Sequence, residues 1–83
     1  MKKEPPGFDV FSNNLEQQFQ KPITGGLSAE TKFRDLEEWT SLQALIVISS
    51  FDWDYGITIS ADELRKAVTI DDLYALVTQK MQG

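Results

Sequence analysis

Trp39-Thr40-Ser41-Leu42 marks the predicted start of the longest helix in this chain of 83 residues. Thr40 with Gln43 three residues later forms a T-x-x-Q capping box, which predicts Thr40 as the N-cap and Ser41 as the first helical residue. A helix N-terminus offers unpaired N–H groups and partial positive charge, which favour an attached phosphate. The hydroxyl of Ser41 is therefore a candidate phosphoester site, unless it only shares the capping with Thr40.

This helix is predicted to span residues 41–55, because Gly56 can supply the left-handed residue that ends a helix. Its apolar residues fall on two faces. The face assigned to the core comprises Ala44, Val47, Ile48, Phe51 and Tyr55. The opposite face comprises Leu42, Ile46 and Trp53, with Ser49 between them. A second apolar face is not needed in a monomer, so either the preceding loop or a partner protein covers it. We expect Ile46 to be substantially exposed.

A first helix over residues 8–20 is predicted by a helical apolar pattern of Phe8, Phe11, Leu15 and Phe19. Pro22 ends this helix, because the residue before a proline avoids the helical conformation. Residues 21–39 then form a long loop with its own apolar residues, which lies along the helices and has room for a helical turn over residues 32–38.

Two further capping boxes open the last helices. Ser60 with Glu63 predicts a short helix over residues 61–67, and Thr69 with Asp72 predicts a helix from Ile70 to about Lys80. The expected fold is all-α: a small four-helix bundle with a long loop between helices 1 and 2 and a short third helix. We expect residues 1–7 to be a disordered tail and residues 8–83 to form a single domain.

Composition narrows the possible functions. A net charge of −5 argues against nucleic-acid binding, which needs Lys and Arg to neutralise phosphates. No apolar run is long enough to span a membrane, and no signal-peptide core follows Met1, so a cytoplasmic location is expected. The chain lacks cysteine and histidine, which removes thiolate chemistry, the usual general base and the commonest metal ligand.

Several segments together carry a resemblance to a known family. In order along the chain they are Phe33-Arg34-Asp35-Leu36, Ser41-Leu42, the following apolar helix, Tyr55-Gly56-Ile57 and Thr69-Ile70. With these segments the chain resembles an acyl carrier protein from Phe8 to Val77. The resemblance implies that Ser41 receives 4′-phosphopantetheine, whose terminal thiol carries acyl groups as thioesters, as in fatty acid biosynthesis. It also implies a phosphopantetheinyl transferase and acyl-transferring or acyl-activating enzymes as partners of a monomeric carrier.

The resemblance further implies which residues meet partners and cargo. Thr40, Leu42, Ile46 and Trp53 are the candidate partner-binding residues. The candidate acyl pocket between the helices is lined by Val47, Ile48, Leu64 and Ile70, residues that ordinary core packing would also require. The chain departs from the family in two ways. Thr40 replaces the common aspartate. The exposed positions of the second helix include Gln43, Ile46 and Trp53, with the carboxylates Asp52 and Asp54 only near its far end, which suggests a specialised carrier.

Three alternatives remain open. A catalytic Ser41 would need an activating base, and the sequence supplies no histidine and no motif that places a lysine beside it, so we do not expect an enzyme. The series Asp52, Asp54, Thr58, Ser60 and Glu63 matches ligand positions of a calcium-binding EF-hand loop, but Ile57 occupies the position that requires glycine. The third alternative is a small helical docking module without a prosthetic group.

Overall fold

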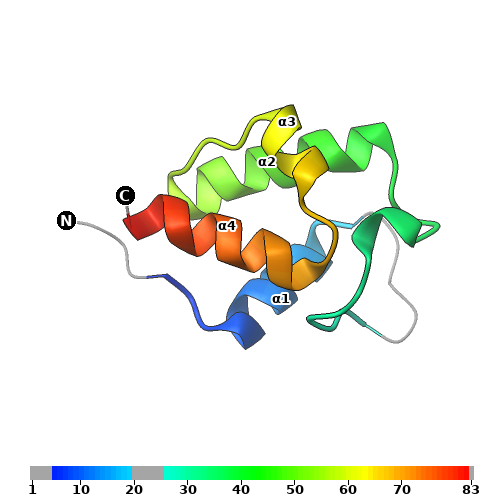
Figure 1. The fold of residues 1–83 in the computed structure, drawn as a ribbon, viewed down its shortest axis with the longest axis horizontal. Helices are drawn as coiled ribbons and strands as arrows, with labels where there is room; N and C mark the ends of the chain where they lie inside the picture. The colour runs from blue at the N-terminus through cyan, green and yellow to red at the C-terminus, as the bar shows by residue number, and fades with distance from the viewer. Residues whose placement is uncertain (1–4, 20–25, 83) are drawn as a thin grey trace.

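The computed structural model describes residues 5–19 and 26–82. Its helices are α1 (Phe8–Gln17), the 3-10 helix η1 (Phe33–Asp35), α2 (Ser41–Tyr55), α3 (Ala61–Lys66) and α4 (Ile70–Gln82). Figure 1 shows the long loop between α1 and α2 and the short α3 above α4. The predicted all-α architecture with a short third helix is confirmed.

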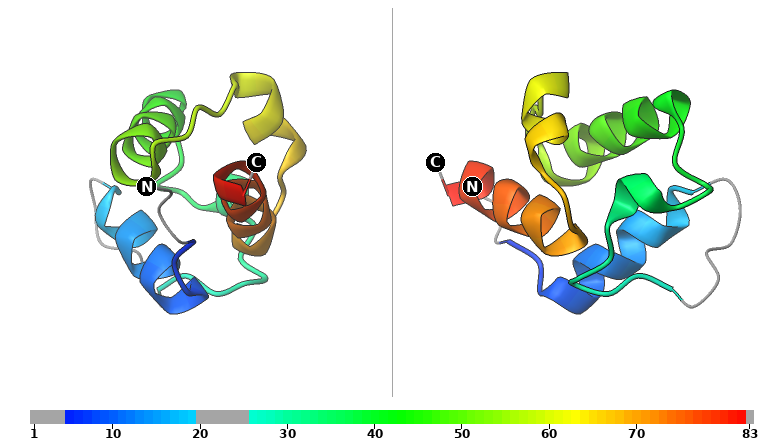
Figure 2. Two further views of the ribbon diagram at one scale, coloured as in Figure 1. Left: turned by 90° about the vertical axis from the view of Figure 1, so that its left-hand side faces the viewer. Right: turned by 45° about the vertical axis from the view of Figure 1, so that its right-hand side comes forward.

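The core lies where α1, α2 and α4 meet, and in Figure 2 α3 lies on the side between α2 and α4. The Phe11 ring is fully buried and packs on Phe51, Tyr55 and Tyr74, with ring centroids 5.3–6.2 Å apart. The buried apolar residues are Phe11, Leu15, Phe19, Phe33, Val47, Phe51, Ile57, Ile59, Leu64, Ala67, Ile70, Leu73 and Val77. Each helix contributes at least one of them, so all of the helices share one core.

Helix α1 ends at Gln17, earlier than the predicted residue 20. The N–H groups of Gln18 and Phe19 donate to the carbonyls of Leu15 and Glu16, which are three residues back rather than four. This tighter turn ends the α-helix before the proline that the prediction used as its stop. Phe19 is nevertheless buried, as its place in the apolar pattern requires.

The described part of the long loop, residues 26–39, is fastened to the start of α4. The N–H groups of Ile70 and Asp71 donate to the carbonyls of Thr31 and Ala29, each at 3.0 Å. A single antiparallel bridge joins Lys32 to Thr69. The expected helical turn over residues 32–38 is present in shorter form as η1, which buries Phe33 completely.

Side chains cap the C-terminal helices much as predicted. Ser60 and Glu63 form a complete capping box at α3, which ends at Lys66 rather than at residue 67. At α4, a carboxylate oxygen of Asp72 accepts from the N–H groups of Val68 and Thr69, and these bonds lower the pKa of Asp72. The ion pair with Lys80 at 2.8 Å, together with the Ser60 N–H, lowers the pKa of Glu63.

Residues 5–7 of the expected tail lie within the described part of the chain, and the disorder of the tail stays a prediction. The hydroxyl of Tyr74 donates to the carbonyl of Pro6 at 2.8 Å, and Pro6 is partly buried. Residues 1–4 of the predicted tail lie outside the described residues. The segment just before α1 is therefore attached to α4 by at least this contact.

Candidate attachment site at the start of α2

Thr40 caps α2 in the predicted register. Its backbone is extended (φ −135°, ψ 170°), and its Oγ1 accepts a hydrogen bond from the N–H of Gln43 at 3.0 Å. The Thr40 carbonyl accepts the first helical bond, from Ala44, also at 3.0 Å. Ser41 is therefore the first residue of α2. The helix ends as predicted at Gly56, whose φ of 67° lies in the left-handed region that favours glycine.

The second half of the predicted capping box is wrong, because the Gln43 side chain does not reach back to Thr40. Gln43 is only 3% exposed, and its Nε2 donates to the carbonyl of Gln18 at 3.0 Å. That carbonyl lies just beyond the end of α1, where carbonyls lack helical donors. Gln43 thus joins the start of α2 to the end of α1, and it is not one of the exposed positions of α2.

Ser41 is exposed, and its hydroxyl makes no hydrogen bond with any residue of the described part. Thr40 supplies the side-chain cap of α2, so the alternative in which Ser41 shares the capping is not observed. The first N–H groups of a helix have no intrahelical acceptor, and the helix dipole gives this end partial positive charge. The hydroxyl of Ser41 is therefore free, accessible and placed where a phosphate is favoured.

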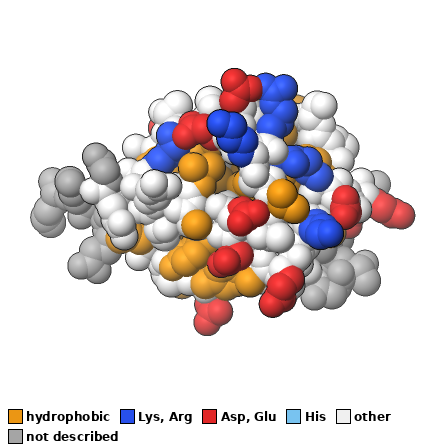
Figure 3. All heavy atoms as spheres, in the orientation of Figure 1, with side chains coloured by type: hydrophobic (Ala, Val, Ile, Leu, Met, Phe, Trp, Pro, Cys, Tyr) orange, Lys and Arg blue, Asp and Glu red, His pale blue; other side chains and the backbone are white. Residues whose placement is uncertain are grey.

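A mostly apolar hollow of about 300 Å³ begins at Ser41 and runs between α2 and α3. Its lining residues are Arg34, Trp39, Ser41, Ala44, Leu45, Ile48, Ala61, Leu64 and Arg65. Basic and acidic side chains lie next to one another in the upper half of the face drawn in Figure 3, where α3 lies in Figure 1. Of the two arginines that line the hollow, Arg34 donates to the carbonyls of Leu64 and Ala67, and Arg65 forms an ion pair with Asp62.

The predicted acyl pocket is divided between this hollow and the core. Ile48 and Leu64 line the hollow beside Ser41. Val47 and Ile70 are fully buried in the core cluster and do not line it. The structure therefore brings only the first two of these residues to the surface that an arm on Ser41 would meet.

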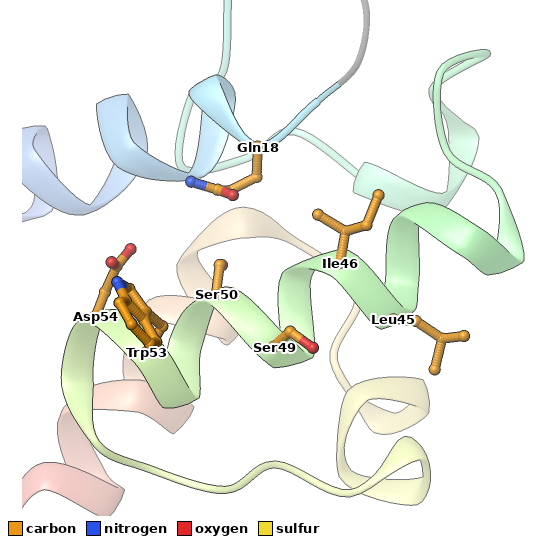
Figure 4. A pocket seen from close by; sticks show the side chains of 7 residues that line it. All are labelled: Gln18, Leu45, Ile46, Ser49, Ser50, Trp53 and Asp54. Carbon is orange, nitrogen blue, oxygen red and sulfur yellow. The ribbon is translucent and has the colours of Figure 1, made fainter.

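A second hollow, of about 460 Å³, lies between α2 and the end of α1. Its lining residues are Gln18, Leu45, Ile46, Ser49, Ser50, Trp53 and Asp54 (Figure 4). The expectation that Ile46 is substantially exposed is wrong: Ile46 is partly buried, and Figure 4 shows it pointing toward the α1 end, where Gln18 lies. The prediction also missed Leu45, which is 62% exposed. A rotation of about 100° per residue places Leu45 beside Leu42, and this spacing could have revealed it.

The sequence matches no family model and no curated protein. Among solved structures, the fold is similar to the solution NMR structure of the holo acyl carrier protein from Geobacter metallireducens. The two chains are 30% identical, with a TM-score of 0.76 over 93% of this chain and 87% of that one. This chain belongs to the acyl carrier protein family. It is therefore a carrier and not an enzyme.

The calcium-binding alternative does not agree with the local geometry. Helix α2 continues through Asp52 and Asp54 to Tyr55, so these carboxylates do not begin an open loop. The carboxylate of Glu63 is already bonded to the Ser60 N–H and to Lys80. Within residues 5–19 and 26–82, no group of three or more acidic side chains could hold a metal ion.

No helix in the same described residues is long and apolar enough to cross a membrane.

Proposed function

We propose that this acyl carrier protein carries acyl groups as thioesters on a 4′-phosphopantetheine arm attached to Ser41, and presents them to biosynthetic enzymes. The observation that carries the proposal is the exposed hydroxyl of Ser41, which has no partner among the described residues and opens α2. The similar protein from Geobacter metallireducens was solved in its holo form.

The residues around Ser41 fit the phosphate end of such an arm. Thr40 holds the helix start with its side chain, which leaves the serine hydroxyl available. The N-terminus of α2 favours the negative charge that a phosphodiester would add. When bound, the arm supplies a terminal thiol to which acyl groups can be attached.

We further propose that the hollow beside Ser41 shelters a short cargo. Its volume of about 300 Å³ matches a small ligand site, and Ile48 and Leu64 supply part of its apolar wall. Val47 and Ile70 lie in the closed core, so a longer chain would reach them only if the helices parted. The pathway, the acyl cargo and a cytoplasmic location stay predictions.

The arm can be attached without any catalytic group on this chain. A phosphopantetheinyl transferase would transfer the phosphopantetheine group of coenzyme A to Ser41. The serine Oγ–P bond forms, the pyrophosphate bond of coenzyme A breaks, the hydroxyl proton leaves, and 3′,5′-ADP is released. The chain itself contributes only an accessible hydroxyl at a favourable helix end.

The test is incubation of the unmodified chain with coenzyme A, Mg²⁺ and a phosphopantetheinyl transferase, followed by intact mass and peptide mapping. One phosphopantetheine group should be added, on Ser41. Ser41→Ala should abolish the addition, whereas Ser49→Ala, at another exposed serine of α2, should leave it intact. Addition at Ser49 or Ser50 would show that the assignment is wrong, and no addition to the parent would favour a docking module without a prosthetic group.

A further inference from the structure

The short helix α3 forms one wall of the hollow beside Ser41. Ala61, Leu64 and Arg65 line the hollow from α3, and Trp39 lines it from the long loop. Helix α3 has only six residues, and a helix of this length is not stable without contacts to the rest of the chain. The contacts that hold α3 therefore determine how wide the hollow is.

The C-terminal end of α3 lacks the left-handed residue that ends α2. Gly56 supplies that conformation after α2, whereas Ala67, the residue after α3, is extended (φ −78°, ψ 141°). The carbonyls at this end of α3 are instead bonded by Arg34, whose Nη2 donates to the oxygens of Leu64 at 2.7 Å and Ala67 at 2.6 Å. A charged donor strengthens such bonds, and positive charge is favourable at the C-terminus of a helix.

Arg34 is itself held in place by the long loop. It belongs to η1, and its guanidinium carbon lies 5.2 Å from the centre of the ring of Phe33, which is fully buried. The Phe33 ring also packs on Trp39, with ring centroids 4.8 Å apart. Arg34 therefore joins the α3 wall of the hollow to the loop wall. The ion pair between Glu63 and Lys80 also holds α3, but it leads to α4 and not to the loop.

We propose that Arg34 is a positioning residue that sets the longest cargo the hollow accepts. With its two hydrogen bonds in place, α3 is held against the loop and the hollow has a volume of about 300 Å³. Without them, the end of α3 moves outward more easily, and the hollow extends toward Val47 and Ile70, which are otherwise closed off in the core. That the cargo is an acyl group rests on the proposed function; the attachment of α3 by Arg34 does not.

The test uses the full unmodified chain and the linear alcohols from butanol to nonanol, which are uncharged mimics of an acyl chain. NMR titration of the backbone amides gives Kd for each alcohol and shows where it binds. Each further methylene that is buried should lower Kd about fourfold, whereas a methylene left in water should change Kd little. The alcohol at which Kd stops falling therefore measures how long a chain the hollow accepts.

We expect Kd to stop falling at a shorter alcohol for the parent than for Arg34→Met, so that the longest alcohols bind the variant about tenfold more tightly. Arg34→Lys keeps the charge but presents no guanidinium, and its series should lie between those two. Lys66→Met is the matched control. It removes a positive charge from an exposed position of α3 without touching the Arg34 bonds, and its series should equal that of the parent.

Hydrogen exchange separates the attachment of α3 from a general loss of stability. The N–H groups of Leu64 and Ala67 donate to carbonyls within the α3 segment, and they should exchange about tenfold faster in Arg34→Met. Tyr74→Phe removes a hydrogen bond to the segment before α1 and so lowers the overall stability by another route. It should leave the exchange of these two amides and the alcohol series unchanged.

An alcohol series that stops at the same length for the parent and Arg34→Met would overturn the proposal. An equal lengthening in Tyr74→Phe or Lys66→Met would overturn it as well, and so would the absence of any alcohol binding in the hollow. The alcohols are measured without an arm on Ser41. Failure of phosphopantetheine addition therefore refutes the proposed function alone, and failure of the alcohol experiment refutes the role of Arg34 alone.

Discussion

Gln43→Glu should destabilise the chain near neutral pH, because the Gln43 side chain donates a hydrogen bond to the Gln18 carbonyl. In a capping box the same side chain would only accept, and glutamate there serves as well as glutamine or slightly better. In the structure, the Nε2 of Gln43 lies 3.0 Å from the Gln18 oxygen, and the residue is 3% exposed. An ionised carboxylate cannot donate and would face a carbonyl in a buried place.

The expected loss has two parts. Removing a neutral hydrogen bond costs about 1 kcal/mol. Burial beside the carbonyl oxygen raises the pKa of the introduced carboxyl above its ordinary value of about 4.3, and a rise of about two units costs about 2.7 kcal/mol at neutral pH. The free energy of unfolding should therefore fall by about 3–4 kcal/mol, whereas a capping role predicts almost no change.

The deficit should depend on pH in a defined direction. Below about pH 4.3 the introduced carboxyl is protonated in the folded and unfolded chains alike, and its O–H can donate to the Gln18 carbonyl. The protonated carboxyl therefore stabilises the folded chain below about pH 4.3, and this contribution is lost as the pH rises through the raised pKa of the folded state. The difference from the parent should thus be small near pH 4 and large near pH 7.

The assay is urea unfolding followed by far-UV circular dichroism, with every variant compared with the parent at the same pH. This comparison is needed because the lowered pKa values of Glu63 and Asp72 make the parent itself less stable in acid. Gln43→Met is the control: it removes the donor without adding a titrating group, so its loss of about 1–3 kcal/mol should be similar at both pH values. A Gln43→Glu variant as stable as the parent at pH 7 would refute the donor role.

Two further predictions concern the ends of the helices around the hollow. Thr40→Ala should lower the free energy of unfolding by about 1 kcal/mol through loss of the α2 cap. Thr40→Asp should be tolerated, because aspartate also caps a helix. A Thr40→Asp variant that is much less stable than the parent in urea unfolding would contradict the register of α2. Arg34→Met should lower the free energy of unfolding by about 1–2 kcal/mol, because the Arg34 guanidinium donates to the carbonyls of Leu64 (2.7 Å) and Ala67 (2.6 Å) at the end of α3. The charge-matched change Lys66→Met should have little effect. Equal losses of stability for the two variants in urea unfolding would show that only charge matters.

Local patterns predicted most of the fold because they act over a few residues. Thr40, Ser60 and Gly56 fixed three helix boundaries, each through one backbone interaction that the sequence makes visible. Longer-range contacts were not visible in this way. The hydrogen bonds of Arg34 reach more than thirty residues along the chain, a separation for which the sequence offers no local signal.

The candidate site was predictable in part for the same reason. Ser41 follows from its place after the cap, which is a local feature. The role of Gln43 could not be inferred, because it depends on where the end of α1 comes to lie. The exposure of side chains along α2 could not be inferred for the same reason. Ile46 is partly buried at the hollow beside α1, whereas Leu45, one residue earlier, is exposed.

The two apolar faces of α2 differ in how much they contribute to the stability of the fold. Val47 and Phe51 are almost fully buried against the other helices, so substitutions there should act on folding. Leu42 and Trp53 contribute little to the core because most of their surface is already in water, so substitutions there should change the free energy of unfolding little. Ser41 lies at the N-terminal end of α2, beside the hollow between α2 and α3. Changes on the exposed face of α2 should therefore leave the core on its other face undisturbed.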